Sequence, residues 1–239
     1  MAEFDLVIRG GQVATGFGTT RCDIGVKDGR IVAMAERLTD GTKLVDAAGT
    51  LVLPGGVDSH CHIEEPSPFG AVHEDSFITA SASAFVGGTT SVVCFVPHWK
   101  GHGIWDRYRD YRQRAATGML DHAFHQVIAD PTDSVIEQEI PRIVAEGVRS
   151  LKVFLTYEPL HLGDREYLKV LVAARKNGCL VTVHCENYDA IGWRTGELLK
   201  AGLTAPKYHA WSRPSIVERE ATHRAIALAE LVDQPIQIF

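Results

Sequence analysis

Beyond residue 55, apolar runs of strand length alternate with stretches of helical length. The strand candidates cover residues 56–63, 91–97, 123–129, 150–157, 180–187 and 235–239. The helical candidates cover residues 72–85, 105–117, 134–145, 165–176, 189–201 and 216–232. Repeated strand–helix units with continuously apolar strands predict a parallel sheet whose outer face is covered by helices. Six strands fit the opening of an eight-stranded barrel better than an open two-faced sheet, so we predict an α/β fold with an incomplete (β/α)8 TIM barrel.

The first 55 residues follow a different pattern. Short β-like runs cover residues 4–9, 22–27, 30–35, 43–46 and 51–53, and turn residues separate them. Gly10-Gly11 predicts a turn, and Asp28-Gly29 predicts a two-residue hairpin turn. Because no helix of useful length fits here, we predict a β-sandwich segment over residues 1–55 and a separate barrel domain over residues 56–239.

The composition excludes several classes of protein. Hydrophobic residues make up 45% and charged residues 23%, with a formal net charge of -6, which is ordinary for a soluble globular chain. There is no basic footprint for nucleic acid, no apolar run long enough to span a bilayer, and no signal peptide at the start. We therefore expect a cytoplasmic protein with no nucleic-acid or membrane partner.

The five cysteines are odd in number and scattered along the chain. We expect reduced thiols and no disulfide framework. Four of them lie in or beside predicted strands, where the expected role is that of a small buried hydrophobic residue: Cys61, Cys94, Cys179 and Cys185.

His60-Cys61-His62 ends the first predicted barrel strand. Side chains alternate along a strand, so both imidazoles point one way and the Cys61 thiol points the other. Two imidazoles at the C-terminal mouth of a barrel strand can hold a metal ion, and that mouth is where barrel active sites lie. A histidine pair with no metal is the alternative that this short motif leaves open.

Two further strands carry reactive side chains. Lys152 lies inside the apolar run of residues 150–155, where a charged ammonium is costly unless it is paired or modified. It is either a lysine that reaches solvent from a strand edge or an amine that has taken up carbon dioxide and bridges two metal ions as a carbamate. His184 closes the strand of residues 180–184 and is either a core histidine or another ligand. Four such groups at the mouths of three strands favour a metal centre.

Several segments resemble the cyclic amidohydrolases. PGGVDSHCHIEEP is similar to their first barrel strand, SLKVFLTY to the strand with the carbamylated lysine, and VHCEN to the strand with the next histidine ligand. HAWSRPSIVEREATHRAIALAEL, residues 209–231, resembles the hydantoinase and dihydropyrimidinase branch. The resemblance covers essentially the whole chain in order, including the β-strands before residue 55.

The resemblance implies a role for five residues. His60 and His62 match ligands of a first metal, Lys152 matches the carbamylated bridge, and His184 matches a ligand of a second metal. The metals are two divalent ions, usually zinc. Tyr157 matches a tyrosine that hydrogen-bonds the developing oxyanion, although it could also merely pack at the strand end. The implied reaction is hydrolysis of a small cyclic amide by a homo-oligomeric enzyme, a tetramer or a dimer.

The chain also departs from the family pattern. In the family another histidine ligand follows the sixth strand, and an aspartate that serves as general base follows the eighth; here the sequence stops at Phe239. We expect a fragment or a truncated product, with little or no native catalysis if it acts alone.

The substrate is only partly indicated. Dihydroorotases carry an arginine two residues after the histidine pair, and Glu64 stands there in this sequence. The resemblance favours opening of a hydantoin or dihydropyrimidine ring, with allantoinase as the alternative enzyme. A non-catalytic scaffold like the collapsin-response proteins is a further alternative, which the presence of the metal-ligand residues disfavours.

Other residues near these motifs receive weaker interpretations. Asp58 either orients a ligand imidazole or makes a structural hydrogen bond. Glu64 and Glu65 either face the substrate or, as we expect, are solvated loop charges. Ser212 or Arg213 is expected to help start the following helix. Loops 98–104 and 158–165 are expected to shape the substrate pocket. Seven histidines match no ligand motif: His73, His98, His102, His122, His125, His161 and His223.

Overall fold

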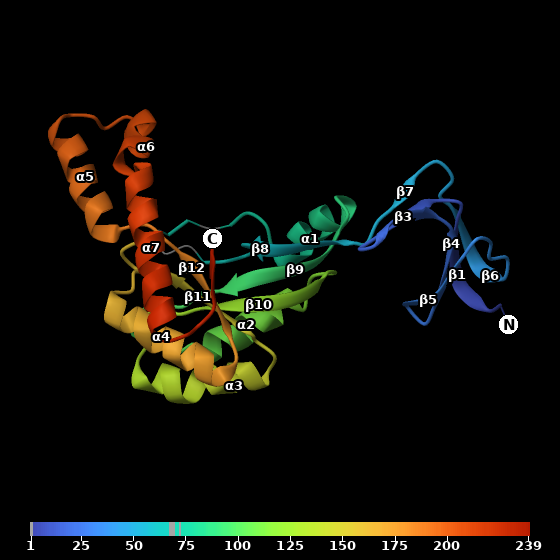
Figure 1. The fold of residues 1–239 in the computed structure, drawn as a ribbon, viewed down its shortest axis with the longest axis horizontal. Coiled ribbons are helices and arrows are strands. Elements are labelled where there is room, and N and C mark those ends of the chain that lie inside the picture. The colour runs from blue at the N-terminus through green and yellow to red at the C-terminus, as the bar shows by residue number, and fades with distance from the viewer. Residues whose placement is uncertain (1, 67–69, 72) are drawn as a thin grey trace. The chain divides into compact units, whose positions relative to one another are not determined.

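The computed structural model describes residues 2–66, 70, 71 and 73–239, and the chain forms two compact units, Met1–Gly56 and Val57–Phe239 (Figure 1). The division lies within one residue of the boundary expected from the sequence. That each unit is an independent folding domain stays a prediction. Among the described residues, no helix is long and apolar enough to cross a membrane.

The first unit consists of two small mixed sheets. One sheet has the order β5-β4-β1-β6, and the other has the order β3-β2-β7. The strands are β1 (Phe4–Arg9), β2 (Gln12–Thr15), β3 (Gly18–Arg21), β4 (Asp23–Lys27), β5 (Arg30–Ala35), β6 (Gly41–Asp46) and β7 (Leu51–Val52).

The predicted hairpin turn at Asp28-Gly29 is confirmed. It joins the antiparallel strands β4 and β5, and both turn residues have positive φ angles, 50° and 71°. A turn of this hand matches the natural twist of the two strands. The β2–β3 hairpin is an addition to the predicted elements. All four residues of β3 are exposed, so no alternation of apolar and polar side chains marked it in the sequence.

The second unit is a six-stranded sheet with the sequential order β13-β12-β11-β10-β9-β8. The four pairings from β9 to β13 are all parallel. The strands are β8 (Gly56–Cys61), β9 (Thr89–Val96), β10 (Asp121–Val127), β11 (Ser150–Phe154), β12 (Leu180–His184) and β13 (Ile236–Ile238). The predicted fold class, an incomplete parallel barrel after an N-terminal β segment, is therefore confirmed.

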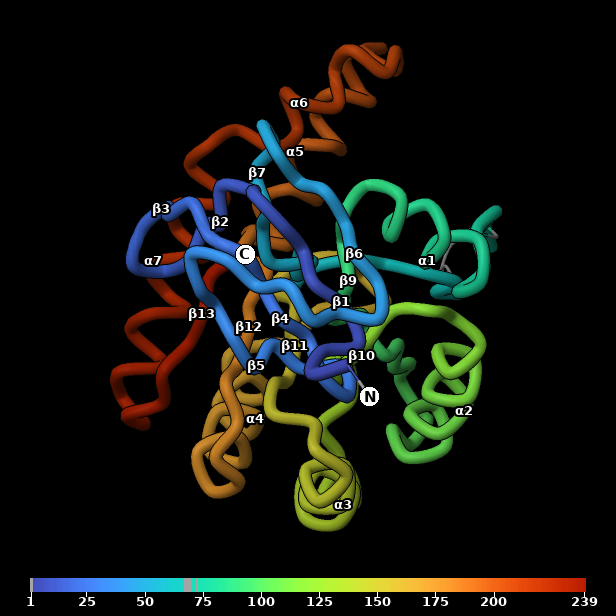
Figure 2. Tube along the Cα trace, turned by 90° about the vertical axis from the view of Figure 1, so that its right-hand side faces the viewer, coloured from blue at the N-terminus to red at the C-terminus, as the bar shows by residue number. Residues whose placement is uncertain are grey.

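Helices cover the outer face of this sheet (Figure 2). The covering helices are α1 (Phe77–Val86), α2 (Trp105–Ala115), α3 (Ile140–Ala145), α4 (Asp164–Asn177) and α7 (Ser215–Leu231), with a π-helical turn η1 (Val135–Glu139). Two further helices, α5 (Tyr188–Lys200) and α6 (His209–Ser212), pack on each other and extend away from the sheet, and a 3-10 turn η2 (Pro206–Tyr208) lies between them (Figure 1). The helix predicted from residue 72 begins at Phe77, where Ser76 caps it, and residue 72 itself lies outside the described residues.

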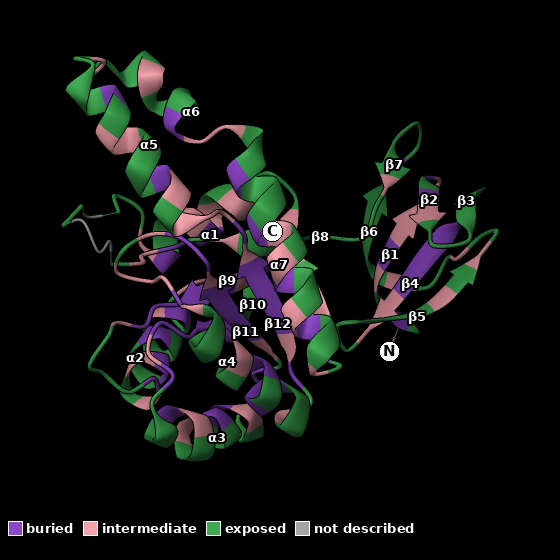
Figure 3. Cartoon of the chain, turned by 60° about the vertical axis from the view of Figure 1, so that its left-hand side comes forward, coloured by how far each residue is buried: buried purple, intermediate pink, exposed green. Residues whose placement is uncertain are grey.

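Strand alternation sorts the side chains of the sheet into two sets. Residues such as Val153 and Val183 point outward and join the core formed with the helices, which is coloured as buried in Figure 3. Lys152 stands beside Thr182, and Phe154 stands beside His184, in the register of β11 and β12. These side chains lie on the inner face. Lys152 and His184 therefore lie on the inner face of the sheet, opposite the core that packs against the helices.

Candidate metal centre

The five residues singled out from the sequence lie at or near the carboxyl ends of their strands. His60 is on β8 and His62 follows it; Lys152 is on β11, and His184 ends β12. Tyr157 follows β11 by three residues. In parallel β/α sheets this edge is where ligands and substrates bind.

His60 and His62 are close to each other and to two phenylalanine rings. The two imidazole centroids lie 5.5 Å apart, and each is 4.7 Å from the ring of Phe95. The ring of Phe239 lies 4.3 Å from that of His60. Burial first, and then the charge of Lys152, lowers the pKa of His60. A neutral imidazole is the form that binds a metal.

Lys152 is buried without a counter-ion. Its side chain is 2% exposed, and no carboxylate pairs with it among the residues that the structure describes. Its Nζ lies 4.4 Å from the ring centroid of Phe239 and 4.8 Å from that of Phe154. These contacts favour the ammonium, but burial prevails and lowers the pKa of Lys152 to about 8. The amine is therefore more available for reaction than that of an ordinary lysine.

His184 is the start of a chain of polar contacts. Its Nε2 lies 3.1 Å from Oε2 of Glu186, and the same oxygen accepts a hydrogen bond of 2.6 Å from Nη1 of Arg213. The expectation that Arg213 helps to start the next helix is wrong, because its guanidinium binds Glu186 and α7 has no side-chain cap. Ser212 also does not cap α7; its hydroxyl donates to the carbonyl of His209.

Tyr157 has an unusual backbone conformation at the same mouth. Its φ is +64°, in the left-handed region that bulky residues rarely adopt. Its carbonyl accepts hydrogen bonds of 2.8 Å from the N–H groups of both Leu160 and His161. The tyrosine ring lies 5.1 Å from that of His184, and the guanidinium of Arg213 is 5.5 Å from its centroid. Burial raises the pKa of Tyr157, so its hydroxyl stays a proton donor.

A cavity of about 370 Å³ opens beside these groups. Tyr157, His184, Glu186, Arg213 and Phe239 are among its lining residues. It provides space for a small molecule next to a hydroxyl donor, an imidazole and a guanidinium.

The acidic residues around the histidine pair have defined partners. Nδ1 of His62 contacts Oε2 of Glu65, and the Glu65 side chain is only 20% exposed. Glu64 accepts a hydrogen bond of 3.0 Å from the N–H of Phe77. The expectation that both are solvated loop charges is therefore wrong. The contact between Glu65 and His62 is local, three positions along the chain, whereas the bond between Glu64 and Phe77 forms only when α1 folds against this loop.

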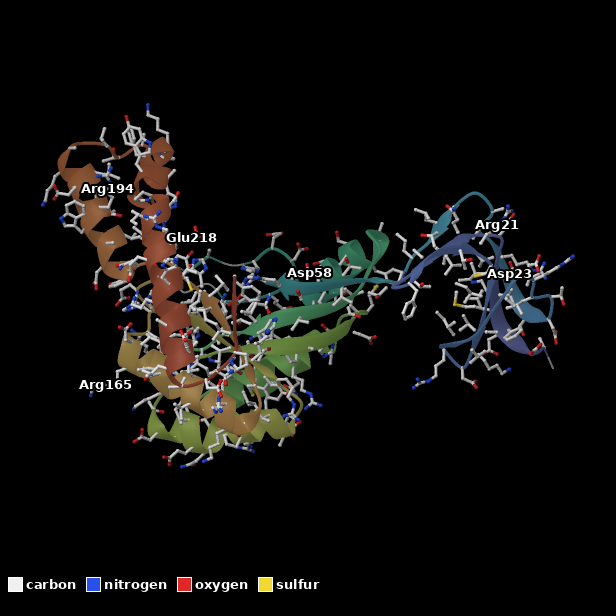
Figure 4. The ribbon with its side chains drawn as sticks, viewed as in Figure 1. Arg21, Asp23, Asp58, Arg165, Arg194 and Glu218 are labelled. Atoms are coloured by element: carbon white, nitrogen blue, oxygen red, sulfur yellow. The ribbon has the colours of Figure 1, made fainter. Side chains whose placement is uncertain are left out.

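Of the two roles expected for Asp58, which is labelled in Figure 4, the structure shows the structural hydrogen bond. Its carboxylate accepts from the backbone N–H of His60 at 3.0 Å, and no imidazole contact accompanies this among the described residues.

His125 is a buried histidine whose role sequence reasoning missed. Its Nε2 bonds the carbonyl of Ser59 at 3.0 Å, and its Nδ1 bonds the hydroxyl of Ser150. A carbonyl can only accept, so the proton is on Nε2 and Nδ1 accepts from the hydroxyl. His125 thus ties β10 to the residue just before His60. His125 and Val127 are two positions apart on β10, so their side chains share a face. Val127 stands beside Lys152 in the register, which places His125 on the inner face with Lys152.

Loop 98–104 is held at the same edge by specific contacts. His98 is fully buried; its Nδ1 accepts from the N–H of Ala129, and its Nε2 donates to the carbonyl of His102. Glu139 accepts from the N–H groups of Ile104 and Trp105 and so caps the start of α2. In loop 158–165 the ring of His161 stacks 4.4 Å from that of Tyr188. The pocket-shaping role of both loops stays a prediction.

These donors fit part of a metal centre. Two imidazoles and a buried amine share one face, and a third imidazole lies at the next strand end. Within residues 2–66, 70, 71 and 73–239, no group of three or more His, Cys, Asp or Glu side chains is arranged to hold a metal ion. The chain therefore supplies separate donors, and the ring of Phe239 lies against both His60 and Lys152.

The chain was compared with known proteins. No family model matches it. A D-hydantoinase of Ralstonia pickettii is 42% identical over 98% of this chain and 51% of that protein. A D-hydantoinase of Rhizobium radiobacter is 40% identical with the same coverages, and a dihydropyrimidinase of Rattus norvegicus is 33% identical over 98% of this chain and 46% of its own length. The chain is a homologue of the hydantoinases and dihydropyrimidinases.

Solved structures agree with this assignment. A D-hydantoinase structure superposes with a TM-score of 0.94 at 41% identity, over 98% of this chain and 51% of that one. The dihydropyrimidinase from Brevibacillus agri NCHU1002 gives 0.92 at 36% identity, over 97% and 51%. The family resemblance inferred from the sequence motifs is thus confirmed. This hydantoinase homologue spans about half the length of the curated relatives it matches, the N-terminal half.

Proposed function

We propose that the protein containing this chain opens the ring of a hydantoin or dihydropyrimidine by metal-dependent hydrolysis of a cyclic amide. The observation that carries this proposal is Lys152, buried without a counter-ion on the face that also bears His60 and His62. The names of the relatives support the substrate class, since they are D-hydantoinases and a dihydropyrimidinase.

Each ligand residue has a proposed place. His60 and His62 would bind one divalent ion, and His184 would bind the second. Lys152 would bridge the two after its neutral amine adds to carbon dioxide and loses a proton, which gives an anionic carbamate. The lowered pKa of Lys152 supports this role, because only the neutral amine can attack carbon dioxide. Zinc is the proposed metal, since imidazole and oxygen ligands suit it.

The other residues act on the substrate or on the ligands. When bound, the metal ions lower the pKa of a water molecule and polarise the ring carbonyl. Tyr157 would donate its hydroxyl proton in a hydrogen bond to the carbonyl oxygen as negative charge develops there. Glu65 and Glu186 contact one ring nitrogen each of His62 and His184, which leaves the other nitrogen of each ring for a metal.

Two alternatives compete with this function. An allantoinase would use the same ligand residues on a different cyclic amide. A non-catalytic scaffold needs none of them, and the four ligand residues disfavour it. We further propose a cytoplasmic homo-oligomer, a tetramer or a dimer, because the family resemblance implies one.

The test combines substrate, metal and mass measurements on the purified protein. Hydantoin, dihydrouracil and allantoin are assayed side by side, zinc is counted per chain, and mass spectrometry of the folded protein looks for carbon dioxide on Lys152. We expect hydantoin or dihydrouracil to be opened and Lys152 to be modified. A protein without stoichiometric metal indicates a scaffold, and preference for allantoin indicates allantoinase. An active, metal-loaded protein with unmodified Lys152 would remove the bridge from the proposal.

A further inference from the structure

Two cysteine thiols meet beneath the histidine pair. Cys61, between His60 and His62, is the last residue of β8, and its Sγ lies 3.4 Å from Sγ of Cys94 on β9. Cys61 is partly exposed, whereas Cys94 is completely buried. Both thiols belong to the face opposite the imidazoles, against the core with the helices. All five cysteines of the chain are free thiols.

We propose that Cys61 and Cys94 form an oxidation site: peroxide converts them to a disulfide that shifts the backbone carrying His60 and His62. The disulfide itself is independent of the proposed function, and only its effect on metal binding rests on it.

The strand arrangement permits the bond. β8 and β9 are neighbours in the sheet, and neighbouring strands lie about 4.8 Å apart. Disulfides join Cα atoms that are roughly 4.4–6.8 Å apart, so a link between adjacent strands falls within this range. The sulfur atoms must close from 3.4 Å to about 2.05 Å, a shift that the last residue of a strand can absorb. In the described part of the chain, no other pair of thiols is in contact.

The difference in exposure assigns an order to the reaction. Hydrogen peroxide first oxidises the accessible Cys61 thiol to a sulfenic acid and releases one water. The Cys94 thiol then attacks this sulfur, the S–S bond forms, and the sulfenic oxygen leaves with two protons as a second water. One peroxide molecule is reduced to two waters while the two thiols are oxidised. Because Cys94 is adjacent, the second step competes with further oxidation of Cys61.

The consequence follows from the position of Cys61. Its backbone is continuous with that of both histidines. Drawing the Cys61 sulfur toward β9 therefore displaces both imidazoles at the same time. Their rings are packed against Phe95, which holds them in one arrangement. A metal site tolerates little displacement of its ligands, so we expect weaker zinc binding in the oxidised form.

The first experiment maps the disulfide in the folded protein. The protein is treated with hydrogen peroxide, denatured, alkylated and digested. We expect a Cys61–Cys94 cross-linked peptide, free thiols falling from five to three, and reversal by dithiothreitol. Cys61→Ser and Cys94→Ser should each abolish the cross-link, and Cys179→Ser, at a buried cysteine away from the pair, should retain it. The wild-type map needs no variant, so a misfolded variant does not weaken the test.

Three results would overturn the oxidation site. They are five unchanged thiols, a cross-link through other cysteines, and overoxidation of Cys61 with Cys94 still free.

The second experiment compares zinc binding before and after oxidation. We expect at least a tenfold loss of zinc affinity on oxidation, recovery on reduction, and no loss for Cys61→Ser. An oxidised protein with the cross-link and unchanged zinc affinity would refute the effect on the histidines. A reduced protein that binds no zinc would refute the proposed metal centre, and the peptide map would still decide the disulfide.

Discussion

At the scale of single residues, the buried Lys152 opposes the stability of the fold. An ammonium with 2% exposure has lost its hydration, and only ring faces replace the water. At pH 7 the lysine is protonated in both the folded and the unfolded chain, so the whole desolvation cost falls on the folded state. This cost disappears above about pH 10.5, where the side chain is neutral in both states.

We therefore predict that Lys152→Met stabilises the unmodified, metal-free chain at pH 7. The lowering of the pKa from 10.5 to about 8 corresponds to about 3 kcal/mol, and a gain of roughly 1–3 kcal/mol is expected. Urea denaturation followed by circular dichroism measures it. Lys169→Met, at an exposed lysine of α4, should change stability by less than about 0.5 kcal/mol. A destabilised Lys152→Met protein would contradict the interpretation.

Glu186 acts on His184 and is the second residue-scale test. Its carboxylate contacts Nε2 of His184 and is itself held by Arg213. We predict that Glu186→Gln weakens zinc binding roughly 10- to 100-fold, because an imidazole loses its charged hydrogen-bond acceptor. A competitive zinc titration measures the affinity. Glu197→Gln, on the exposed side of α5, is the matched control. Equal affinities for the two variants would exclude this role.

Tyr157 can be tested through the rate of the reaction. In the active protein, Tyr157→Phe should lower kcat roughly 100- to 1,000-fold, because one donor to the oxyanion is lost. Zinc content should stay unchanged, since the hydroxyl is not a proposed ligand. Tyr208→Phe, in the 3-10 turn beyond α5, should retain full kcat. If Tyr157→Phe turns over at the wild-type rate, Tyr157 has no part in the mechanism.

Some of these residues could be identified from the sequence and others could not, for a physical reason. His60, His62, Lys152 and His184 stand out because strand alternation and apolar neighbours reveal where their side chains point. Glu186 and Arg213 are 27 positions apart. They meet because α6 packs against α5 and the N–H of Asn187 bonds the carbonyl of Val217. No local pattern encodes such a contact.

At the scale of elements, buried and amphipathic segments were predictable, whereas exposed ones were not. The six barrel strands follow from apolar runs, and their covering helices follow from the intervals between them. In the hairpin of β2 and β3, β3 is fully exposed and is held by its pairing with β2, which itself contributes only Val13 to the core. The π-helical turn η1 precedes Pro141, which has no backbone N–H to continue the ordinary helical bonding.

Asp23 joins β4 to two connecting segments of the first unit and supports a prediction about pH. Its carboxylate, on β4 (Figure 4), accepts 2.9 Å and 2.8 Å hydrogen bonds from the N–H groups of Leu38 and Gly10. The bond from Leu38 above all, aided by that from Gly10, lowers the pKa of Asp23 despite its burial. A carboxylate whose pKa is depressed by folding stabilises the fold above its unfolded pKa of about 3.9. That stabilisation is lost as the pH falls through the lower folded value.

We predict that Asp23→Ala destabilises the first unit by roughly 1–3 kcal/mol at pH 7, since two hydrogen bonds to a charged group are removed. The difference from the wild type should shrink as the pH falls below about 4, where the wild-type carboxylate becomes protonated. Thermal melts recorded at several pH values measure both effects. Glu36→Gln, at an exposed residue, is the control. A difference that does not change with pH would assign the effect to packing alone.

At the scale of the whole molecule, the exposed strand edges decide how a polypeptide of residues 1–239 behaves by itself. β8 and β13 stand at the two ends of the sheet order, so each has an outer row of backbone groups. A barrel removes such edges only by closing, and six strands do not complete an eight-stranded barrel. Apolar side chains on the edge strand β8, such as Val57, are also exposed.

We predict that this polypeptide, expressed alone, self-associates and opens neither hydantoins nor dihydropyrimidines at a native rate. The separated donors of the proposed metal centre give the catalytic half of the prediction, because members of a catalytic unit act together and the loss of one costs orders of magnitude. Analytical ultracentrifugation and ring-opening assays measure the two halves. Val57→Lys places a charge on the β8 edge and should reduce self-association, whereas Val86→Lys, also at an exposed valine but at the end of α1, should not. A monomer with a cooperative melt and full turnover would refute both halves; a soluble but inactive monomer would refute only the first.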